Sequence, residues 1–354
     1  MTVNIALVGA GSVARRHVDV LHRLGGARVV SVTDAHEPAA QKLAAELDAA
    51  SFTDPDQALD AVTVDAVYVC VPPFAHGPGE RAALSRRKPM FVEKPVGLGL
   101  EIAEQIGALV QDAGVVTGTG YHWRCLDTAV RAQELLTDAP PLLANGYWLD
   151  KRPPVPWWGW AERSGGQVVE QLTHVLDMAR YLLGEPVEVY AAGIRRAPEA
   201  APQDYGDVDD ATAATVRFAS GAVATLAATS ALALKHRAAL HTVSRELYLE
   251  LSEDRLTAYT GAERAEHTPA EDPRIAVDRE FLQAVRGERA STRAPYAEAL
   301  RTHRLACAIA ESARTGQPVT LSEDTGEAVA PHDGAASLLP GQGPDSAVAV
   351  EGPA

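Results

Sequence analysis

The stretch VNIALVGAGSVARRHVDVL, residues 3–21, decides the fold of the first half of the chain. A short apolar strand leads into GAGSVA at residues 9–14, and a helical pattern follows. Gly9 permits the tight turn, Gly11 lets the backbone approach a pyrophosphate, and small Ala14 lets the helix pack on the strand. The first helical residues, Ser12 and Val13, then present backbone N–H groups to the phosphates. The stretch therefore predicts a dinucleotide-binding strand, turn and helix.

A second apolar strand is expected at residues 28–33, and it ends in Asp34, 25 residues after Gly9. A carboxylate at this place can accept hydrogen bonds from both ribose hydroxyls of the cofactor, and it would repel a 2′-phosphate. NAD(H) is therefore favoured as the cofactor, with NADP(H) as the alternative.

Strands and helices continue to alternate up to residue 121, which indicates an α/β Rossmann domain with a doubly wound parallel sheet. Short segments follow three of its strands at the carboxyl ends, where ligands of such sheets bind. These segments are Val71-Pro72-Pro73-Phe74-Ala75-His76, Glu93-Lys94-Pro95 and Gly120-Tyr121-His122-Trp123-Arg124. A lysine before proline is held extended, so the amine of Lys94 is aimed from a fixed backbone.

An α+β domain with a large, mostly antiparallel open sheet is expected over residues 122–321, because short β-rich segments replace the alternation. The expected strands are 142–148, 187–194, 211–218, 222–229 and 241–251, and the expected late helices are 275–286 and 295–315. One face of such a sheet can stay free for a partner subunit. Residues 322–354 turn to Gly, Ala, Pro, Asp and Ser with little periodicity, which predicts a flexible tail without a catalytic role.

One strong helix is expected within this second half, over SGGQVVEQLTHVLDMARYLLG at residues 164–184. At about 100° per residue its apolar residues share one side, and Glu170, His174, Asp177 and Tyr181 share the other. A solvated polar face is the ordinary explanation of such a pattern. This face, however, holds two carboxylates, an imidazole and a phenol, groups that can move protons near neutral pH.

Four of the five tryptophans, Trp148, Trp157, Trp158 and Trp160, lie just before this helix. Their rings can stack on a sugar or another ring substrate, or they can be core or subunit-contact residues. Both interpretations stay open at this point.

Composition excludes several classes of protein. The 354 residues favour two domains, and the hydrophobic content of 46% supports globular packing. A net charge of −15 disfavours nucleic acid or an anionic membrane as the main partner. No window is apolar enough for a membrane span, and the first residues do not read as a signal peptide, so a cytoplasmic location is expected. Cys70, Cys125 and Cys307 lie far apart, which argues against both a disulfide framework and a zinc cluster, and no metal site is predicted.

Five motifs in this order, VGAGSVARRH, CVPPFAHG, FVEKPVG, GYHWR and SGGQVVEQLTHVLDMARYLLGE, resemble the Gfo/Idh/MocA family of oxidoreductases. The similarity spans about residues 3–321. It implies a Rossmann domain, an α+β domain whose open sheet commonly makes dimers or tetramers, and hydride transfer at C4 of a nicotinamide. The substrate class that the family implies is a small sugar, cyclitol or related polyol with a hydroxyl or keto group.

The resemblance also carries over site residues. Lys94 matches the lysine that contacts the substrate hydroxyl, and His174 matches the histidine taken as the base in inositol dehydrogenases. Glu170 stands where those enzymes have an aspartate, which lengthens the side chain by one methylene, and Asp177 matches an orienting acid. The full predicted cofactor site is Gly9, Gly11, Ser12, Val13, Ala14, Asp34, Val71, Pro72, His76, Glu93, Lys94 and Arg124. The predicted substrate site is Lys94, Tyr121, Trp123, Trp157, Trp158, Glu170 and His174.

An NAD(P)-dependent dehydrogenase or reductase acting on CH–OH groups is therefore the leading hypothesis. The base must lie within hydrogen-bond reach of the hydroxyl, and the unperturbed pKa of a histidine, about 6.5, suits His174 to that task. Lys94 is assigned first to polarising the oxygen, although which of the two accepts the proton stays open. Two alternatives remain: an enzyme that uses tightly bound NAD transiently for sugar epimerisation, elimination or glycoside cleavage, and a non-catalytic dinucleotide-binding regulatory protein.

Overall fold

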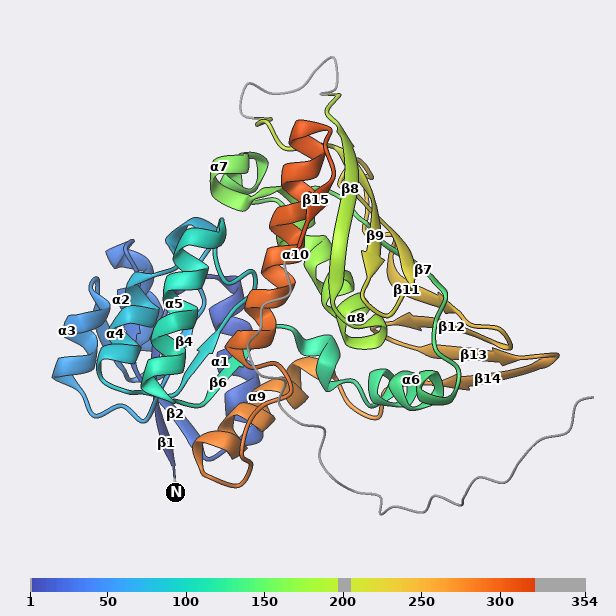
Figure 1. Cartoon of the computed structure of the whole chain (residues 1–354). Coiled ribbons are helices and arrows are strands. Elements are labelled where there is room, and N and C mark those ends of the chain that lie inside the picture. The colour runs from blue at the N-terminus through green and yellow to red at the C-terminus, as the bar shows by residue number, and fades with distance from the viewer. Residues whose placement is uncertain (1, 197–204, 322–354) are drawn as a thin grey trace, which may run out of the picture. The chain divides into compact units, whose positions relative to one another are not determined.

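The computed structural model describes residues 2–196 and 205–321, and its N-terminal part is a parallel sheet flanked by helices (Figure 1). The six strands follow the order β3-β2-β1-β4-β5-β6. They are β1 Val3–Val8, β2 Ala27–Thr33, β3 Ala50–Phe52, β4 Ala66–Val69, β5 Met90–Val92 and β6 Thr117–Thr119. The helices are α1 Ser12–Leu24, α2 Glu37–Leu47, α3 Pro55–Ala61, α4 Pro78–Ser85 and α5 Leu100–Ala113. Because β1 lies between β2 and β4, its carboxyl end is the point where the strand order reverses and where ligands of such sheets bind.

The second half forms a nine-stranded sheet in the order β14-β13-β12-β11-β7-β10-β9-β8-β15. Its first five strands in sequence are β7 Leu143–Leu149, β8 Pro186–Ile194, β9 Ala211–Phe218, β10 Val223–Thr229 and β11 Arg237–Val243. They are followed by β12 Leu247–Ser252, β13 Leu256–Thr260, β14 Glu263–His267 and β15 Val319–Thr320. The pair β7 and β10 is parallel, and every other pairing recorded for this sheet is antiparallel.

One face of the nine-stranded sheet is packed and the other is open. Buried and exposed residues alternate along β9, as expected for a strand with one covered face. The covering helices are α6 Asp127–Asp138, α8 Thr173–Leu183 and, along β8, α10 Tyr296–Thr315. Close packing of α8 requires a glycine in β7, because a Cβ at Gly146 would lie 2.6 Å from Cγ1 of Val175 and 2.7 Å from Cδ2 of Leu226.

The last two helices pack differently: α9 Pro273–Val285 contacts β6 and α1 of the N-terminal part, whereas α10 Tyr296–Thr315 contacts strands of both sheets. On α9, Phe281 contacts Tyr68 and Phe91 edge-on, at ring-centroid distances of 5.4 and 5.6 Å, and so joins the core of the N-terminal sheet. On α10, Tyr296 and Leu300 join a second N-terminal core cluster. Figure 1 shows α9 beside α1, in agreement with their contacts.

The parallel sheet and the mostly antiparallel sheet confirm the expected fold class. One expected strand is wrong. Residues 241–251 are not one strand, because β11 and β12 form a hairpin around residues 244–246. The expected helix over 164–184 is present over residues 166–183, and it begins only after Gly165, whose φ of +72° ends the short helix α7 Ala161–Ser164. A π-helical turn, η4 Val168–Leu172, then leads into α8.

Helix α6 and strands β13 and β14 were also not expected from the sequence. The tail expected over residues 322–354 lies outside the described residues. None of the helices in the described ranges combines the length and apolarity that a bilayer span requires.

Candidate active site

The glycine turn after β1 has the geometry that a dinucleotide needs. Gly9 has a φ of +98°, and a Cβ there would lie 2.2 Å from the carbonyl oxygen of Cys70 at the end of β4. Gly11 faces open space, since a Cβ there would meet nothing within 4 Å. Gly11 also starts α1 without a side-chain cap, so the first-turn N–H groups, those of Ser12, Val13 and Ala14, stay available for an anion. The turn fits the pyrophosphate of a dinucleotide.

Asp34 lies beside this turn. Its Oδ2 accepts from the backbone N of Ala10, and its Oδ1 accepts from the backbone N of His36, each at 2.8 Å. Val71, with half-buried Pro72 after it, lies across the turn, because its Cγ1 is 3.5 Å from the position of a Cβ on Gly9. The structure therefore brings the glycine turn, Asp34 and the end of β4 together.

Lys94, at the end of β5, meets Glu170 from the π-helical turn. The Nζ of Lys94 donates to the backbone oxygen of Glu170 at 2.7 Å and to its Oε1 at 3.0 Å. The second carboxylate oxygen of Glu170 accepts from Nε1 of Trp158 at 3.0 Å. Both ionic side chains are mostly buried, at 15% and 17% exposure. Residues that are 76 positions apart thus form one hydrogen-bonded group.

His174 lies one turn after Glu170 and is buried among aromatic rings. Its ring stacks on Trp123 and Trp148 at centroid distances of 6.4 and 5.6 Å, and the ring of His122 lies 4.8 Å away. Burial lowers the pKa of His174 well below its usual value, and the charges of His122 and Lys94 lower it further. Its Nδ1 has no hydrogen-bond partner among the described residues. His174 is therefore a neutral imidazole, one helical turn from the carboxylate that binds the amine of Lys94.

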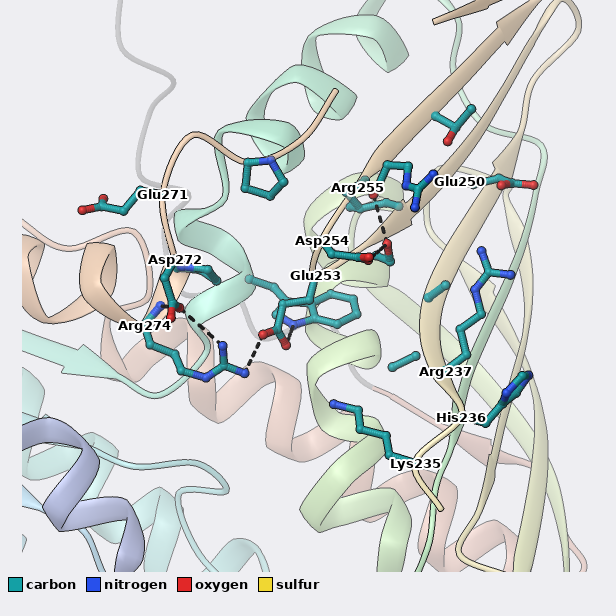
Figure 2. A pocket seen from close by; sticks show the side chains of 18 of the residues that line it. Lys235, His236, Arg237, Glu250, Glu253, Asp254, Arg255, Glu271, Asp272 and Arg274 are labelled. Carbon is teal, nitrogen blue, oxygen red and sulfur yellow. Dashed lines mark hydrogen bonds and ion pairs between the residues drawn. The ribbon is translucent and has the colours of Figure 1, made fainter. Parts of the chain in front are cut away.

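A cavity of about 870 Å³ adjoins this ring cluster through Trp123, which lines it (Figure 2). Glu253 in its wall accepts from Nε1 of Trp123 at 3.2 Å and pairs with Nη2 of Arg274 at 2.5 Å. Burial would raise the pKa of Glu253, but its contacts with His122 and Arg274 hold it well below its usual range. Lys235, also in the wall, places its ammonium 5.1 Å from the ring centre of Trp148.

Four other predicted site residues have protein partners. Arg124 is buried and donates from Nε and Nη2 to the two oxygens of Asp177, at 2.8 and 2.9 Å. Asp177 also accepts from Oγ1 of Thr302 at 2.7 Å. The charged groups of Arg124 and Asp177 are therefore bound by other residues of the protein. The polar face expected to be either wet or catalytic is thus largely buried, and its Asp177 binds across to α10.

Tyr121 and His76 are held in the same way. The hydroxyl of Tyr121 lies 2.7 Å from Oγ1 of Thr173, and burial raises the pKa of Tyr121. Nδ1 of His76 lies 2.5 Å from Oε1 of Glu80, whose other oxygen accepts from the backbone N of Gly77 and closes the start of α4.

The two tryptophans in the predicted substrate site differ in their environments. Trp158 is fully buried, so it follows the core interpretation while its N–H positions Glu170. Trp157 is half-buried and meets Phe74 edge-on at 6.3 Å. Phe74, in the 3₁₀ turn η1 Pro73–Ala75, also lies under the guanidinium of Arg163 at 5.5 Å. Aromatic contacts therefore connect the segment after β7 to the end of β4.

Sequence reasoning missed the partners of Glu93. This carboxylate is buried and accepts from His17 and Arg16 of α1, each at 2.9 Å. His17 also contacts both oxygens of Asp278 on α9. One signal was available, because His17 falls on the buried stripe of α1 with Ala14, Val18 and Leu21, where a charged group needs a partner. Within the described residues, no cluster of three or more His, Cys, Asp or Glu could hold a metal ion.

Family models match both halves of the chain. The model described as "Oxidoreductase family, NAD-binding Rossmann fold" matches residues 3–121. The model described as "GFO/IDH/MocA C-terminal domain" matches residues 140–248.

Curated relatives align over the same region. A scyllo-inositol 2-dehydrogenase (NAD(+)) of Bacillus subtilis is 30% identical over 227 residues, covering 62% of this chain and 65% of that enzyme. A myo-inositol 2-dehydrogenase of Thermotoga maritima is 28% identical over 224 residues, covering 62% and 66%. A 2,7-anhydro-N-acetylneuraminate hydratase of Mediterraneibacter gnavus is 28% identical over 232 residues, covering 64% and 61%. The alignments thus span just under two thirds of these relatives.

Solved structures share the whole fold. A levoglucosan dehydrogenase in complex with NADH matches with a TM-score of 0.80 and 21% identity, covering 91% of this chain and 100% of that one. A UDP-N-acetylglucosamine 3-dehydrogenase of Acidithiobacillus ferrooxidans matches with a TM-score of 0.75 and 21% identity, covering 88% and 98%. With an NAD-binding Rossmann fold followed by the family's C-terminal domain, the chain belongs to the Gfo/Idh/MocA family of oxidoreductases.

Proposed function

We propose that the protein is an NAD-dependent oxidoreductase that transfers hydride between C4 of the nicotinamide and a secondary alcohol or ketone of a sugar, cyclitol or related polyol. The observation that carries the proposal is the contact of Lys94 with Glu170 beside a neutral, buried His174. A module that only bound a dinucleotide would have no use for these groups. The names of the inositol dehydrogenase relatives support the substrate class.

Each side chain has one task in this proposal. His174, being neutral, accepts the hydroxyl proton of the alcohol, and it returns that proton in the reverse direction. Lys94 donates to the same oxygen and stabilises the charge that develops on it. Glu170 holds the amine of Lys94 in place. Bound NAD supplies the hydride acceptor, on the glycine turn next to Asp34, which favours NAD over NADP.

A screen of polyols, cyclitols and keto-sugars in both directions, with NAD and NADP, tests the proposal through the absorbance of NADH. His174→Ala and Lys94→Met should each suppress turnover and leave the Kd for NAD close to that of the wild type. His267→Ala, on the exposed strand β14, is the matched control and should turn over normally. Normal turnover of the His174→Ala variant would refute the assignment.

The alternative of transient oxidation predicts a different result. Relatives of this chain include enzymes named as hydratases, which favours keeping this alternative in the test. Under it the purified protein retains NAD, detectable by mass spectrometry, and converts substrate without accumulating NADH. Under the dehydrogenase proposal, turnover depends on added NAD and releases NADH.

We further propose a homodimer or homotetramer formed through the open face of the nine-stranded sheet. Tyr190 and Ile194 on β8 are 50% and 51% exposed, which supports a covering partner subunit. Light scattering of the full chain, compared with a Tyr190→Glu variant, tests this. A cytoplasmic location is proposed as well, and the free thiols of Cys70, Cys125 and Cys307 support it.

A further inference from the structure

His17 is a buried histidine of α1 that meets a carboxylate at each ring nitrogen. Its Nδ1 lies 2.8 Å from both oxygens of Asp278 on α9, and its Nε2 lies 2.9 Å from Oε1 of Glu93 after β5. The side chains of His17, Asp278 and Glu93 are 3%, 1% and 6% exposed. Ionised carboxylates only accept hydrogen bonds, so the ring satisfies both of them only when both of its nitrogens carry a proton.

The charges around His17 balance only in that protonated form. Arg16 also donates to Oε1 of Glu93 at 2.9 Å, so two carboxylates face two cations when His17 is an imidazolium. Tyr68 and Cys70 border the cluster, and burial raises the pKa of both well above their usual values, so they stay neutral. Burial alone would lower the pKa of His17, but Asp278 and Glu93 raise it to about 9.

Glu93 connects this cluster to Lys94. Its Oε2 accepts from the backbone N of Lys94 at 3.0 Å. The carboxylate packs against Gly120 after β6, where only a glycine leaves room for it, since a Cβ there would lie 2.2 Å from Oε2. Because His17 and Arg16 hold the carboxylate of Glu93, the backbone of Lys94 is held as well, and its amine reaches Glu170.

We propose that His17 is a positioning residue, which as an imidazolium bound to α9 fixes Glu93 and thereby holds Lys94 where its amine meets the reacting oxygen. This inference rests on the proposed function in one respect, the role of Lys94 at that oxygen. It adds His17, a buried residue of α1, to the residues on which the role of Lys94 depends.

Nitrogen NMR of the full chain with labelled histidines tests the charge state directly, with the His17 signal assigned from a His17→Gln variant. The imidazolium signal is expected throughout the neutral range, and the proton should be lost only near pH 9. A neutral His17 ring at pH 7 would overturn the proposal.

Kinetics of two variants test the positioning. His17→Gln should lower kcat by roughly 10- to 100-fold, the scale expected when a reacting group is misplaced, and leave the Kd for NAD unchanged. The double variant His17→Gln, Asp278→Asn removes one carboxylate together with the cation, so it should recover stability but not kcat, because Glu93 still lacks the ring of His17 as its partner. Recovery of kcat in the double variant would mean that the loss came from the unpaired Asp278, and it would overturn the positioning role. His22→Gln, at an exposed position of the same helix α1, is the matched control and should turn over normally.

Labelling of lysines with an amine reagent, followed by mass spectrometry, needs no substrate. Lys94 should react faster in His17→Gln than in the wild type, with exposed Lys235 as the internal reference. If the wild type shows no NAD-linked turnover on any polyol, the proposed function fails while labelling still decides the present inference. An unchanged labelling rate of Lys94 in His17→Gln would refute it.

Discussion

Replacing Asp177 with alanine should lower the free energy of unfolding by about 3–5 kcal/mol, the usual loss when one partner of a buried ion pair is removed. Asp177 is fully buried and accepts three hydrogen bonds, two from Arg124 at 2.8 and 2.9 Å and one from Thr302 at 2.7 Å. Alanine leaves Arg124 buried beside an empty space. Glu298 stays 3.2 Å from Nη2 of Arg124, so we expect a loss in the lower half of that range.

Urea unfolding followed by circular dichroism measures this loss, with two comparisons. Glu134→Ala removes an exposed partner of Arg131, with side chains 58% and 49% exposed, and should change stability by no more than about 1 kcal/mol. The double variant Arg124→Met, Asp177→Leu should be more stable than Asp177→Ala, because no charge is left buried without a partner. Wild-type stability of the Asp177→Ala variant would refute the structural role of the pair and return Asp177 to the reacting groups.

Three further outcomes are expected. The pKa of His17 is raised to about 9 in the folded chain, against 6.5 for a free histidine, which corresponds to roughly 3 kcal/mol of stabilisation. This stabilisation should be complete below pH 6.5 and lost as the pH rises through 9. Unfolding measured over a pH series should show that loss for the wild type and not for His17→Gln. Gly120→Ala should abolish turnover or folding, because its Cβ would lie 2.2 Å from Oε2 of Glu93, whereas Gly99→Ala, with nothing within 4 Å, should express and turn over normally. Trp158→Phe removes the N–H that donates to Glu170, a loss of about 1 kcal/mol, and should lower kcat several-fold. Trp160→Phe, in the same tryptophan segment, should leave kcat unchanged.

Much of the fold was predictable because it depends on local patterns. Residues close together in the sequence determine the glycine turn, the alternation of strands and helices, and the β-rich second half. The helix starts two residues later than expected because Gly165 ends the short helix α7, and the Gly-Gly pair at 165–166 was the available signal. The hairpin between β11 and β12 was missed because residues 244–246 carry no glycine or proline.

The candidate site could be predicted only in part, because its pairings join distant positions. Arg124 was predicted to bind the cofactor and Asp177 to orient the reacting groups, yet the fold pairs them with each other across 53 positions. His17 and Asp278 meet across 261 positions, and nothing near either residue points to the other. Residue type indicated which groups need partners, but only the packing of α9 against the N-terminal part and of α10 against both sheets determines which partners they find.

The contacts of the Glu170 carboxylate with Lys94 and Trp158 explain how a glutamate serves at this position. Lys94 has three N–H donors, of which two go to the backbone oxygen and Oε1 of Glu170, so one remains for a substrate oxygen. Because Oε2 accepts from Trp158, the carboxylate spans from the amine to the indole, and an aspartate one methylene shorter would give up one of the two contacts. Trp157, next to that indole, contacts Phe74 of η1, so the tryptophan segment is also held against the turn that follows β4. A Glu170→Asp change should therefore weaken either the contact with Lys94 or the contact with Trp158, although it keeps the negative charge. If Glu170 acted through its charge alone, this change would alter neither contact.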